Sequence, residues 1–137
     1  MDKFAMIIFG ASGDLTKRKL MPALYSLYRE KRLTGEFSIL GIGRTVYSDD
    51  NYRSYILEEL QQFVKSEEQD AALMASFVSH LYYLPMDPAK EEGYPQLRQR
   101  LVELTNEVDP DNLLFYLATP PSLYGVVPIY LKAAGLN

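Results

Sequence analysis

The stretch that decides the fold is residues 4–15, which read Phe-Ala-Met-Ile-Ile-Phe-Gly-Ala-Ser-Gly-Asp-Leu. The first six residues are all apolar, the pattern of a strand that is buried on both faces of a parallel sheet. The next five, Gly10 to Asp14, combine glycine with small and polar side chains, which is typical of a tight turn. A buried strand that runs directly into such a turn predicts the first unit of an α/β fold.

Helical and strand patterns alternate along the rest of the chain. Apolar residues recur at near-helical spacing from Leu15 to about Arg32, so we expect a helix there, kinked at Pro22. Gly135 is expected to cap the last helix. Further strands are predicted at 37–42, 77–84 and 113–118, a loop with a short helix at 66–76, and helices at 48–63, 94–108 and 122–134.

The order βαβαβαβα predicts a doubly wound parallel sheet of the Rossmann type, with helices on both faces. We expect residues 1–137 to form one domain, since a chain of 137 residues with 47% hydrophobic residues suffices for one core. Ligands of such sheets bind at the carboxyl ends of the strands. The informative residues should therefore follow Phe9, Ile42, Leu84 and Ala118.

Composition excludes several classes of function. A formal net charge of -4 argues against nucleic acid as a partner, because that needs surplus basic residues. The chain has no cysteine and one histidine, which excludes disulfides and makes a metal site improbable. No apolar run reaches a membrane-spanning length, so we expect a soluble, cytoplasmic protein that does not contact membranes.

The glycine turn stands where this fold places a pyrophosphate against backbone N–H groups and a helix N-terminus. Gly10 would permit the tight turn and Gly13 a close approach of phosphate, while the hydroxyls of Ser12 and Thr16 would add hydrogen bonds. The usual G-x-G-x-x-G pattern is not matched. A plain strand-to-helix turn with Asp14 as a helix cap fits these residues equally well.

Arg44 follows the second predicted strand, where an acidic residue would bind the ribose of NAD and an arginine the 2′-phosphate of NADP. Its planar, charged guanidinium suits a phosphate, and Thr45 could add a hydroxyl. Taken alone, Arg44 is better explained as a solvated surface residue. Joined to a glycine turn one βα unit upstream, it favours NADP as the cofactor, with Lys17 as a further cation.

Three motifs resemble the coenzyme domain of the glucose-6-phosphate dehydrogenases. Residues 9–25, from Phe-Gly-Ala-Ser-Gly-Asp-Leu to Pro-Ala-Leu-Tyr, are similar to that family's coenzyme fingerprint. Residues 39–44 resemble its second strand with the 2′-phosphate arginine, and residues 114–121 resemble its fourth-strand motif. The motifs keep the family's order and spacing.

The resemblance implies a role for each matched position. Arg44 would bind the 2′-phosphate, Met86 and Asp87 the adenosine side, and Tyr124 the region nearer the nicotinamide. Two of these have an alternative, since Asp87 could cap a helix ahead of Pro88 and Tyr124 could pack in the core. Thr16 stands where the family more often has alanine. The pyrophosphate would be wrapped by Gly10, Ala11, Ser12, Gly13, Asp14, Leu15, Thr16 and Lys17.

The family's catalytic motifs do not occur in residues 1–137. Its lysine-bearing Glu-Lys-Pro segment and its Arg-Ile-Asp-His-Tyr-Leu-Gly-Lys stretch, which supplies the histidine base, are both missing. We assign no catalytic residue, and His80 is expected to be satisfied by a neighbour rather than to act as a base. The complete enzyme would oxidise glucose 6-phosphate to 6-phosphogluconolactone with NADP, in the pentose phosphate pathway.

Two hypotheses follow. In the first, this chain is the coenzyme domain of such an enzyme, truncated before the later strands and lacking the substrate domain, so that it binds NADP and is catalytically incomplete. The sugar phosphate would then be a partner of the full-length enzyme alone. In the second, it is a free-standing NADP-binding sensor or interaction module without catalysis. A truncated sheet would expose an edge and self-associate.

Overall fold

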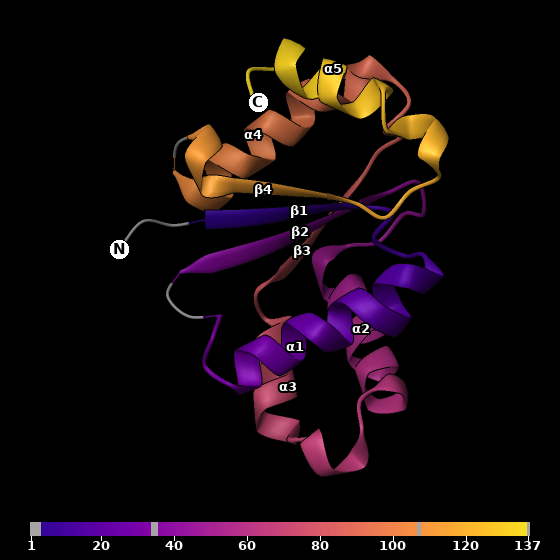
Figure 1. Ribbon diagram of the computed structural model, residues 1–137. Helices are drawn as coiled ribbons and strands as arrows, with labels where there is room; N and C mark the ends of the chain where they lie inside the picture. The colour runs from indigo at the N-terminus through magenta and orange to yellow at the C-terminus, as the bar shows by residue number, and fades with distance from the viewer. Residues whose placement is uncertain (1–3, 34–35, 107, 137) are drawn as a thin grey trace.

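The computed structural model describes residues 4–33, 36–106 and 108–136. A single sheet lies between two layers of helices, with α1, α2 and α3 on one face and α4 and α5 on the other (Figure 1). All strand pairs are parallel, and the strand order is β3-β2-β1-β4. The strands are β1 (Phe4–Phe9), β2 (Phe37–Gly43), β3 (Leu81–Pro85) and β4 (Leu113–Leu117). The predicted doubly wound α/β fold is confirmed.

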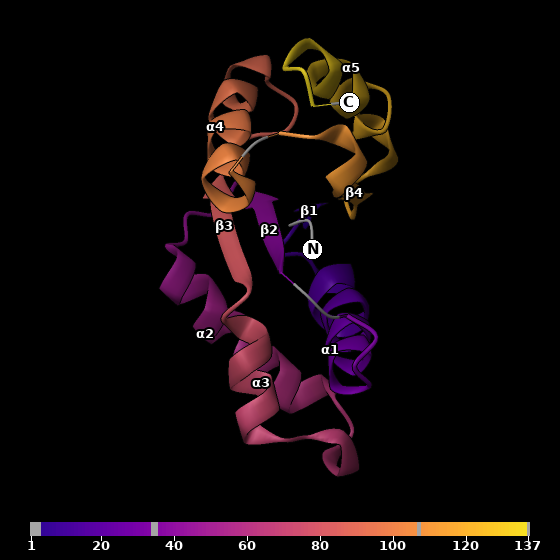
Figure 2. The same ribbon diagram turned by 90° about the vertical axis from the view of Figure 1, so that its left-hand side faces the viewer.

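One α-helix follows each strand except β2, which two α-helices follow before β3 begins. Figure 2 shows the two helical layers on opposite sides of the sheet. The α-helices are α1 (Met21–Arg29), α2 (Asp49–Phe63), α3 (Ala71–Val78), α4 (Tyr94–Thr105) and α5 (Val126–Ala133). A π-helical segment, Thr16–Leu20, leads into α1. Short 3₁₀ turns occupy Ser66–Glu68, Glu91–Gly93, Pro110–Asn112 and Pro121–Leu123. In the part of the chain described, no helix is long and apolar enough to cross a bilayer.

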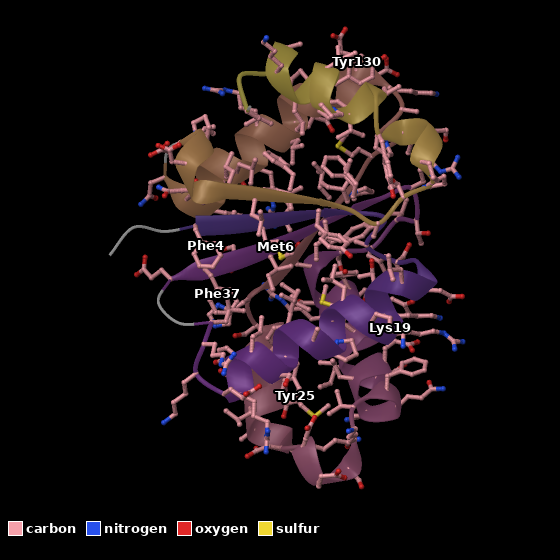
Figure 3. The ribbon with its side chains drawn as sticks, in the orientation of Figure 1. Phe4, Met6, Lys19, Tyr25, Phe37 and Tyr130 are labelled. Carbon is pink, nitrogen blue, oxygen red and sulfur yellow. The ribbon has the colours of Figure 1, made fainter. Side chains whose placement is uncertain are left out.

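The all-apolar sequence of β1 is explained by its central position, since β1 pairs with β2 on one side and β4 on the other. Met6 and Ile8 face the core beneath α1, α2 and α3, whereas Ile7 and Phe9 face the core beneath α4 and α5. Figure 3 shows Met6 on the side of α1, at the level of the sheet. Both faces of β1 are therefore buried, as predicted.

Local chemistry sets two helix ends, and of these the glycine cap of the last helix was predicted and is confirmed. The Ser48 side chain caps α2 by accepting a hydrogen bond from the N–H of Asn51 at 3.1 Å. Gly135 has a left-handed backbone, with φ of 76°, and the N–H of Leu136 closes on the carbonyl of Leu131. Only a residue without Cβ adopts this conformation at little cost, so glycine ends α5.

The predicted third strand, 77–84, was wrong in its first half. Phe77 and Val78 are the last residues of α3, and the strand begins only at Leu81. Asp70 explains the helix, because its carboxylate accepts the N–H groups of Ala72 and Leu73 and caps α3. A helix this short and apolar shows no periodicity that separates it from a buried strand.

The first predicted helix is present, but a different set of its residues faces the core from the set that a regular α-helix would bury. The irregularity lies before Pro22, in the π-helical turn that ends with the N–H of Met21 bonded to the carbonyl of Thr16. Such a turn holds one extra residue, which shifts the buried face of the helix. Met21 and Tyr25 are therefore buried, whereas the apolar side chain of Leu27 is exposed.

Candidate dinucleotide-binding site

A cleft of about 520 Å³ opens at the carboxyl ends of the strands. In Figure 1 the loops that follow β1, β2 and β4 gather at this edge, on the right of the sheet. It lies at the end of β1, whose neighbours β2 and β4 pair with it on opposite sides. This is the topological switch point at which such sheets bind ligands. The lining residues are Gly10, Ser12, Gly13, Gly43, Arg44, Thr45, Asp87, Pro88, Ala89, Ala118, Thr119, Pro120, Ser122 and Leu123.

The glycine turn packs directly against the end of β4. Gly10 has φ of 89°, and a Cβ built on it would lie 2.2 Å from the carbonyl oxygen of Ala118. Both the backbone conformation and the close approach exclude a side chain here. Ser12 and Gly13 then continue the turn along the wall of the cleft. The turn therefore presents backbone, rather than side chains, to the cleft at Gly10 and Gly13.

Thr16 does not reach the cleft. Its side chain is fully buried, and its hydroxyl donates to the carbonyl of Gly10 at 2.8 Å. The prediction that this hydroxyl would add a hydrogen bond to phosphate assigned it the wrong partner. An alanine at this position could not make the contact with Gly10.

Four more residues of the predicted pyrophosphate segment lie away from the cleft lining. Ala11 is buried beneath the turn, whereas Asp14 and Leu15 are exposed. Asp14 does not cap the helix and instead pairs with Lys17, whose Nζ lies 3.5 Å from Oδ1. The phenol of Tyr55 raises the pKa of Lys17, with smaller contributions from nearby carboxylates, so the ammonium stays charged. Lys17 thus adds positive charge beside the turn.

Arg44 is exposed at the end of β2 and lines the cleft opposite the glycine turn. Among the described residues its guanidinium has no ion-pair partner. Its backbone is well fixed, because the hydroxyl of Tyr83 donates to the carbonyl of Thr45 at 2.6 Å. A Cβ on Gly43 would lie 2.7 Å from that hydroxyl, so glycine before Arg44 leaves room for this contact.

The three remaining predicted residues lie in different environments, and one of them lines the cleft. Asp87 lines the cleft, where its carboxylate accepts the N–H of Ala89; it caps a turn, since α4 begins only at Tyr94. Met86 is buried in the core beneath α4. Tyr124 is 49% exposed, so the alternative of core packing is wrong, and it is not part of the cleft lining.

The loop after β4 lines the cleft as well, and the sequence analysis gave none of its cleft-lining residues a role. The hydroxyl of Thr119 is buried there and has no hydrogen-bond partner in the described ranges. Buried hydroxyls in native proteins are normally paired, so this one is available to a ligand. The rule that ligands bind after the strands pointed to Ala118 and its neighbours, but it named no side chain.

His80 lies at the opposite end of the sheet. Its ring stacks on Phe37 with 4.0 Å between ring centres, and Nδ1 is 3.0 Å from the Phe37 carbonyl oxygen. A neighbour therefore satisfies the histidine, as expected. Within the described ranges, no group of three His, Asp or Glu residues could hold a metal ion.

The parallel sheet, the glycine turn at its switch point and the arginine after β2 define a dinucleotide-binding domain. Comparison with known proteins specifies which one. Residues 7–137 match the family model described as glucose-6-phosphate dehydrogenase, NAD binding domain. The chain belongs to this family and is its coenzyme-binding domain, which takes a nicotinamide dinucleotide.

The relatives agree with this assignment. The chain is 46% identical over 133 residues to the glucose-6-phosphate 1-dehydrogenase of Aggregatibacter actinomycetemcomitans, covering 96% of this chain and 26% of that protein. It is 36% identical over 138 residues to that of Bacillus subtilis, covering 98% and 27%. The chain thus spans about a quarter of the length of the curated relatives it matches.

Solved structures show the same fold. A glucose-6-phosphate dehydrogenase in complex with its substrate glucose-6-phosphate superposes with a TM-score of 0.82 at 36% identity, covering 97% of this chain and 28% of that one. The enzyme from Mycobacterium avium also has a TM-score of 0.82, at 28% identity, covering 97% and 27%.

Proposed function

We propose that this chain binds NADP in the cleft, as the coenzyme part of a glucose-6-phosphate 1-dehydrogenase. The observation that carries the proposal is that the glycine turn and Arg44 line one cleft at the switch point of the sheet. In the turn, the N–H groups of Gly10, Ala11 and Gly13 donate to carbonyls within the chain, which leaves the N–H of Ser12 for the diphosphate. The Arg44 guanidinium, which has no ion-pair partner among the described residues, offers a planar fork for the 2′-phosphate.

The residues present fit such a cofactor. The left-handed turn at Gly10 leaves no room for a Cβ beside β4, and the buried Thr119 hydroxyl has no partner in the described part of the chain. Gly10, Ser12 and Gly13 would hold the diphosphate and Arg44 the 2′-phosphate, while Asp87 and its neighbours would lie along the adenosine. When bound, NADP supplies the acceptor for a hydride. The chain's own residues bind and orient it.

Several finer assignments belong to this proposal. Lys17 would strengthen the positive field beside the turn without touching the cofactor directly. Ala11, Leu15 and Thr16 would shape the turn from beneath or from its outer side, with Asp14 holding Lys17. Met86 would support the Asp87 segment from the core, and Tyr124 would reach the nicotinamide side from the turn that precedes α5.

The activity of the whole protein is also a proposal. We infer that it oxidises glucose 6-phosphate to 6-phosphogluconolactone, with the groups that act on the sugar supplied from outside residues 1–137. Two charged small molecules as substrates favour the cytoplasm as its location. Reading the encoding gene beyond codon 137 tests this: a frame that continues into a Glu-Lys-Pro segment and a histidine motif supports the enzyme, and a stop supports a free-standing module.

Calorimetric titration of the chain with NADP and with NAD at low salt tests the cofactor assignment. Charge-assisted hydrogen bonds contribute about 1.5–3 kcal/mol, so Arg44→Ala should weaken NADP binding roughly 10- to 150-fold and leave NAD binding nearly unchanged. Arg29→Ala is the matched control, because Arg29 is an exposed arginine beside Phe37 at the opposite end of the sheet. Equal loss of both cofactors in Arg44→Ala would contradict the 2′-phosphate role.

A further inference from the structure

Four tyrosines gather beneath the carboxyl ends of β1 and β2; we call Tyr47, Tyr52, Tyr55 and Tyr83 the tyrosine cluster. The ring centres of Tyr52 and Tyr83 lie 4.8 Å apart, and Tyr47 meets Tyr83 edge-on at 5.2 Å. Tyr47 also stacks on Tyr55 at 5.5 Å. The cluster is one continuous aromatic contact between α2, β3 and the loop after β2.

Hydroxyls hold every carbonyl along the first three residues of the glycine turn. Tyr52 donates to the carbonyl of Ala11 at 2.9 Å, and Tyr55 donates to that of Ser12 at 3.3 Å. The carbonyl of Gly10 accepts from Thr16. In a planar trans peptide the carbonyl and the following N–H point in opposite directions. By holding the Ala11 carbonyl, Tyr52 therefore turns the Ser12 N–H away from the cluster, on the side of the cleft that Ser12 lines.

The fit around Tyr52 depends on a glycine in β2. A Cβ on Gly41 would lie 2.6 Å from the Cβ of Ala11 and 3.1 Å from the Tyr52 hydroxyl oxygen. Tyr52 itself is fully buried. The absence of a side chain at Gly41 thus lets the Tyr52 hydroxyl and the glycine turn meet.

Tyr83 makes the equivalent contact on the other side of the cluster. Its hydroxyl donates to the carbonyl of Thr45, the residue directly after Arg44. Gly43, directly before Arg44, approaches the same hydroxyl. Tyr83 therefore fixes the backbone on which the Arg44 guanidinium is carried.

Both phenols remain hydrogen-bond donors at neutral pH. Burial raises the pKa of Tyr52 well above its ordinary value, and it raises the pKa of Tyr83 to about 12. A neutral phenol can donate to a carbonyl, whereas a phenolate cannot. The contacts with Ala11 and Thr45 therefore persist throughout the physiological range.

We infer that Tyr52 and Tyr83 are positioning residues for the two phosphate-binding segments: Tyr52 sets the glycine turn for the diphosphate, and Tyr83 sets Arg44 for the 2′-phosphate. The inference rests on the proposed function and deepens it. Because only NADP carries a 2′-phosphate, Tyr83 contributes to the choice between the cofactors, whereas Tyr52 acts on both alike.

The test compares three tyrosine-to-phenylalanine variants of the full chain by calorimetric titration with NADP and NAD. Tyr25→Phe is the matched control, since the buried Tyr25 also donates to a backbone carbonyl, that of Glu68, away from the cleft. Single hydrogen bonds of this kind correspond to about two- to tenfold in affinity. Tyr52→Phe should weaken both cofactors by such a factor, Tyr83→Phe should weaken NADP alone, and Tyr25→Phe should weaken neither.

Amide NMR spectra without cofactor give a second readout. The N–H of Ser12 should shift in Tyr52→Phe and those of Thr45 and Val46 in Tyr83→Phe, with none of these moving in Tyr25→Phe. If Tyr52→Phe unfolds, Tyr55→Phe replaces it, because the partly exposed Tyr55 holds the next carbonyl of the same turn.

The outcomes separate the two proposals. Cofactor affinities in Tyr52→Phe and Tyr83→Phe that match those of Tyr25→Phe, in a chain that binds NADP, would overturn the positioning roles and leave the proposed function standing. A wild-type chain that binds neither cofactor would overturn the proposed function and the inference with it.

Discussion

The carboxylate of Asp49 accepts a hydrogen bond from the backbone N–H of Tyr83 at 2.8 Å. Tyr83 lies on β3, an edge strand of the described sheet, and Asp49 is the first residue of α2. The other oxygen of Asp49 pairs with Arg100 from the opposite helical layer, and Arg53 donates to the carbonyl of Leu81. Side chains thus occupy two of the backbone groups that an open edge would offer to another strand, the N–H of Tyr83 and the carbonyl of Leu81.

Asp49→Ala should lower the free energy of unfolding by about 2 kcal/mol, because it leaves the partly buried Tyr83 N–H without an acceptor and leaves Arg100 with only its contact to Glu103 in the described ranges. Urea denaturation measures the loss. Asp50→Ala is the control, since Asp50 stands in the same first turn of α2 but its side chain is 92% exposed. An exposed ion pair contributes at most about 1 kcal/mol. Equal losses in the two variants would show that Asp49 acts only through the helix dipole.

Gly10→Ala should destabilise the chain by about 3 kcal/mol, because alanine is strained at positive φ and its Cβ would overlap the Ala118 carbonyl. Gly125→Ala is the control, since Gly125 precedes α5 and a Cβ there meets nothing within 4 Å. Thermal and urea unfolding of both variants give the comparison. A Gly10→Ala chain as stable as Gly125→Ala would mean that β4 does not pack against the turn in solution.

Thr119→Val removes a buried hydroxyl that has no partner among the described residues. The stability of the cofactor-free chain should stay the same or rise by up to about 1 kcal/mol, since an unpaired polar atom is lost. NADP affinity should nevertheless fall, because the hydroxyl lies in the cleft lining. Thr105→Val is the contrasting variant: its hydroxyl donates to the Leu101 carbonyl at 2.7 Å, so its removal should destabilise the chain. Unchanged NADP binding in Thr119→Val would exclude a contact with the cofactor.

Alkaline pH should weaken the fold through the buried phenols. Burial raises the pKa of Tyr83 and of Tyr94 from 10.0 to about 12. Between these values the unfolded chain releases protons that the folded chain keeps, so the free energy of unfolding falls as pH rises through this range. Below pH 10 this stabilisation is fully present.

Urea midpoints measured upward from about pH 8 test this dependence. Tyr83→Phe should make the fall shallower by the contribution of one proton, whereas Tyr124→Phe, which removes an exposed phenol, serves as the control. Parallel pH profiles for Tyr83→Phe and wild type would contradict the raised pKa of Tyr83 as a cause of the fall in stability.

The described sheet leaves apolar side chains uncovered on β4. Leu114 is 57% exposed and Tyr116 is 36% exposed, whereas Leu113, Phe115 and Leu117 pack beneath α4 and α5. We therefore expect self-association, with a urea midpoint that rises with protein concentration. Leu114→Lys should remove this dependence, and Val46→Lys, at an exposed valine in a loop, should not. A midpoint independent of concentration in wild type would contradict the expectation.

The alternation of strands and helices was predictable because each strand is either wholly apolar or followed by a strong turn. The boundary between α3 and β3 was not predictable, since an apolar segment as short as the one around Phe77 suits a helix and a buried strand alike. The phase of the first helix was missed because a π-helical turn leaves no local signal in residues 16–20.

The residues of the site also fall into those that the sequence predicted and those that it did not. Gly10, Ser12, Gly13 and Arg44 line the cleft and were predictable from backbone chemistry and from their position after a strand. Asp87 also lines the cleft, but it was named only through the resemblance to the family. The roles of Tyr52, Tyr83 and Thr119 depend on side chains from distant elements that meet only in the folded chain. A single sequence holds no local signal for such contacts.

The packing of Gly10 against Ala118 also has a consequence for biosynthesis. The cleft needs both the turn after the first strand and the segment after the last one, which lie at opposite ends of the described sequence. During translation the ribosome releases the glycine turn early, but its facing wall emerges only after Ala118 and Thr119 have been made. Cofactor capture by a nascent chain would therefore report that the segment after β4 has emerged and packed against the glycine turn.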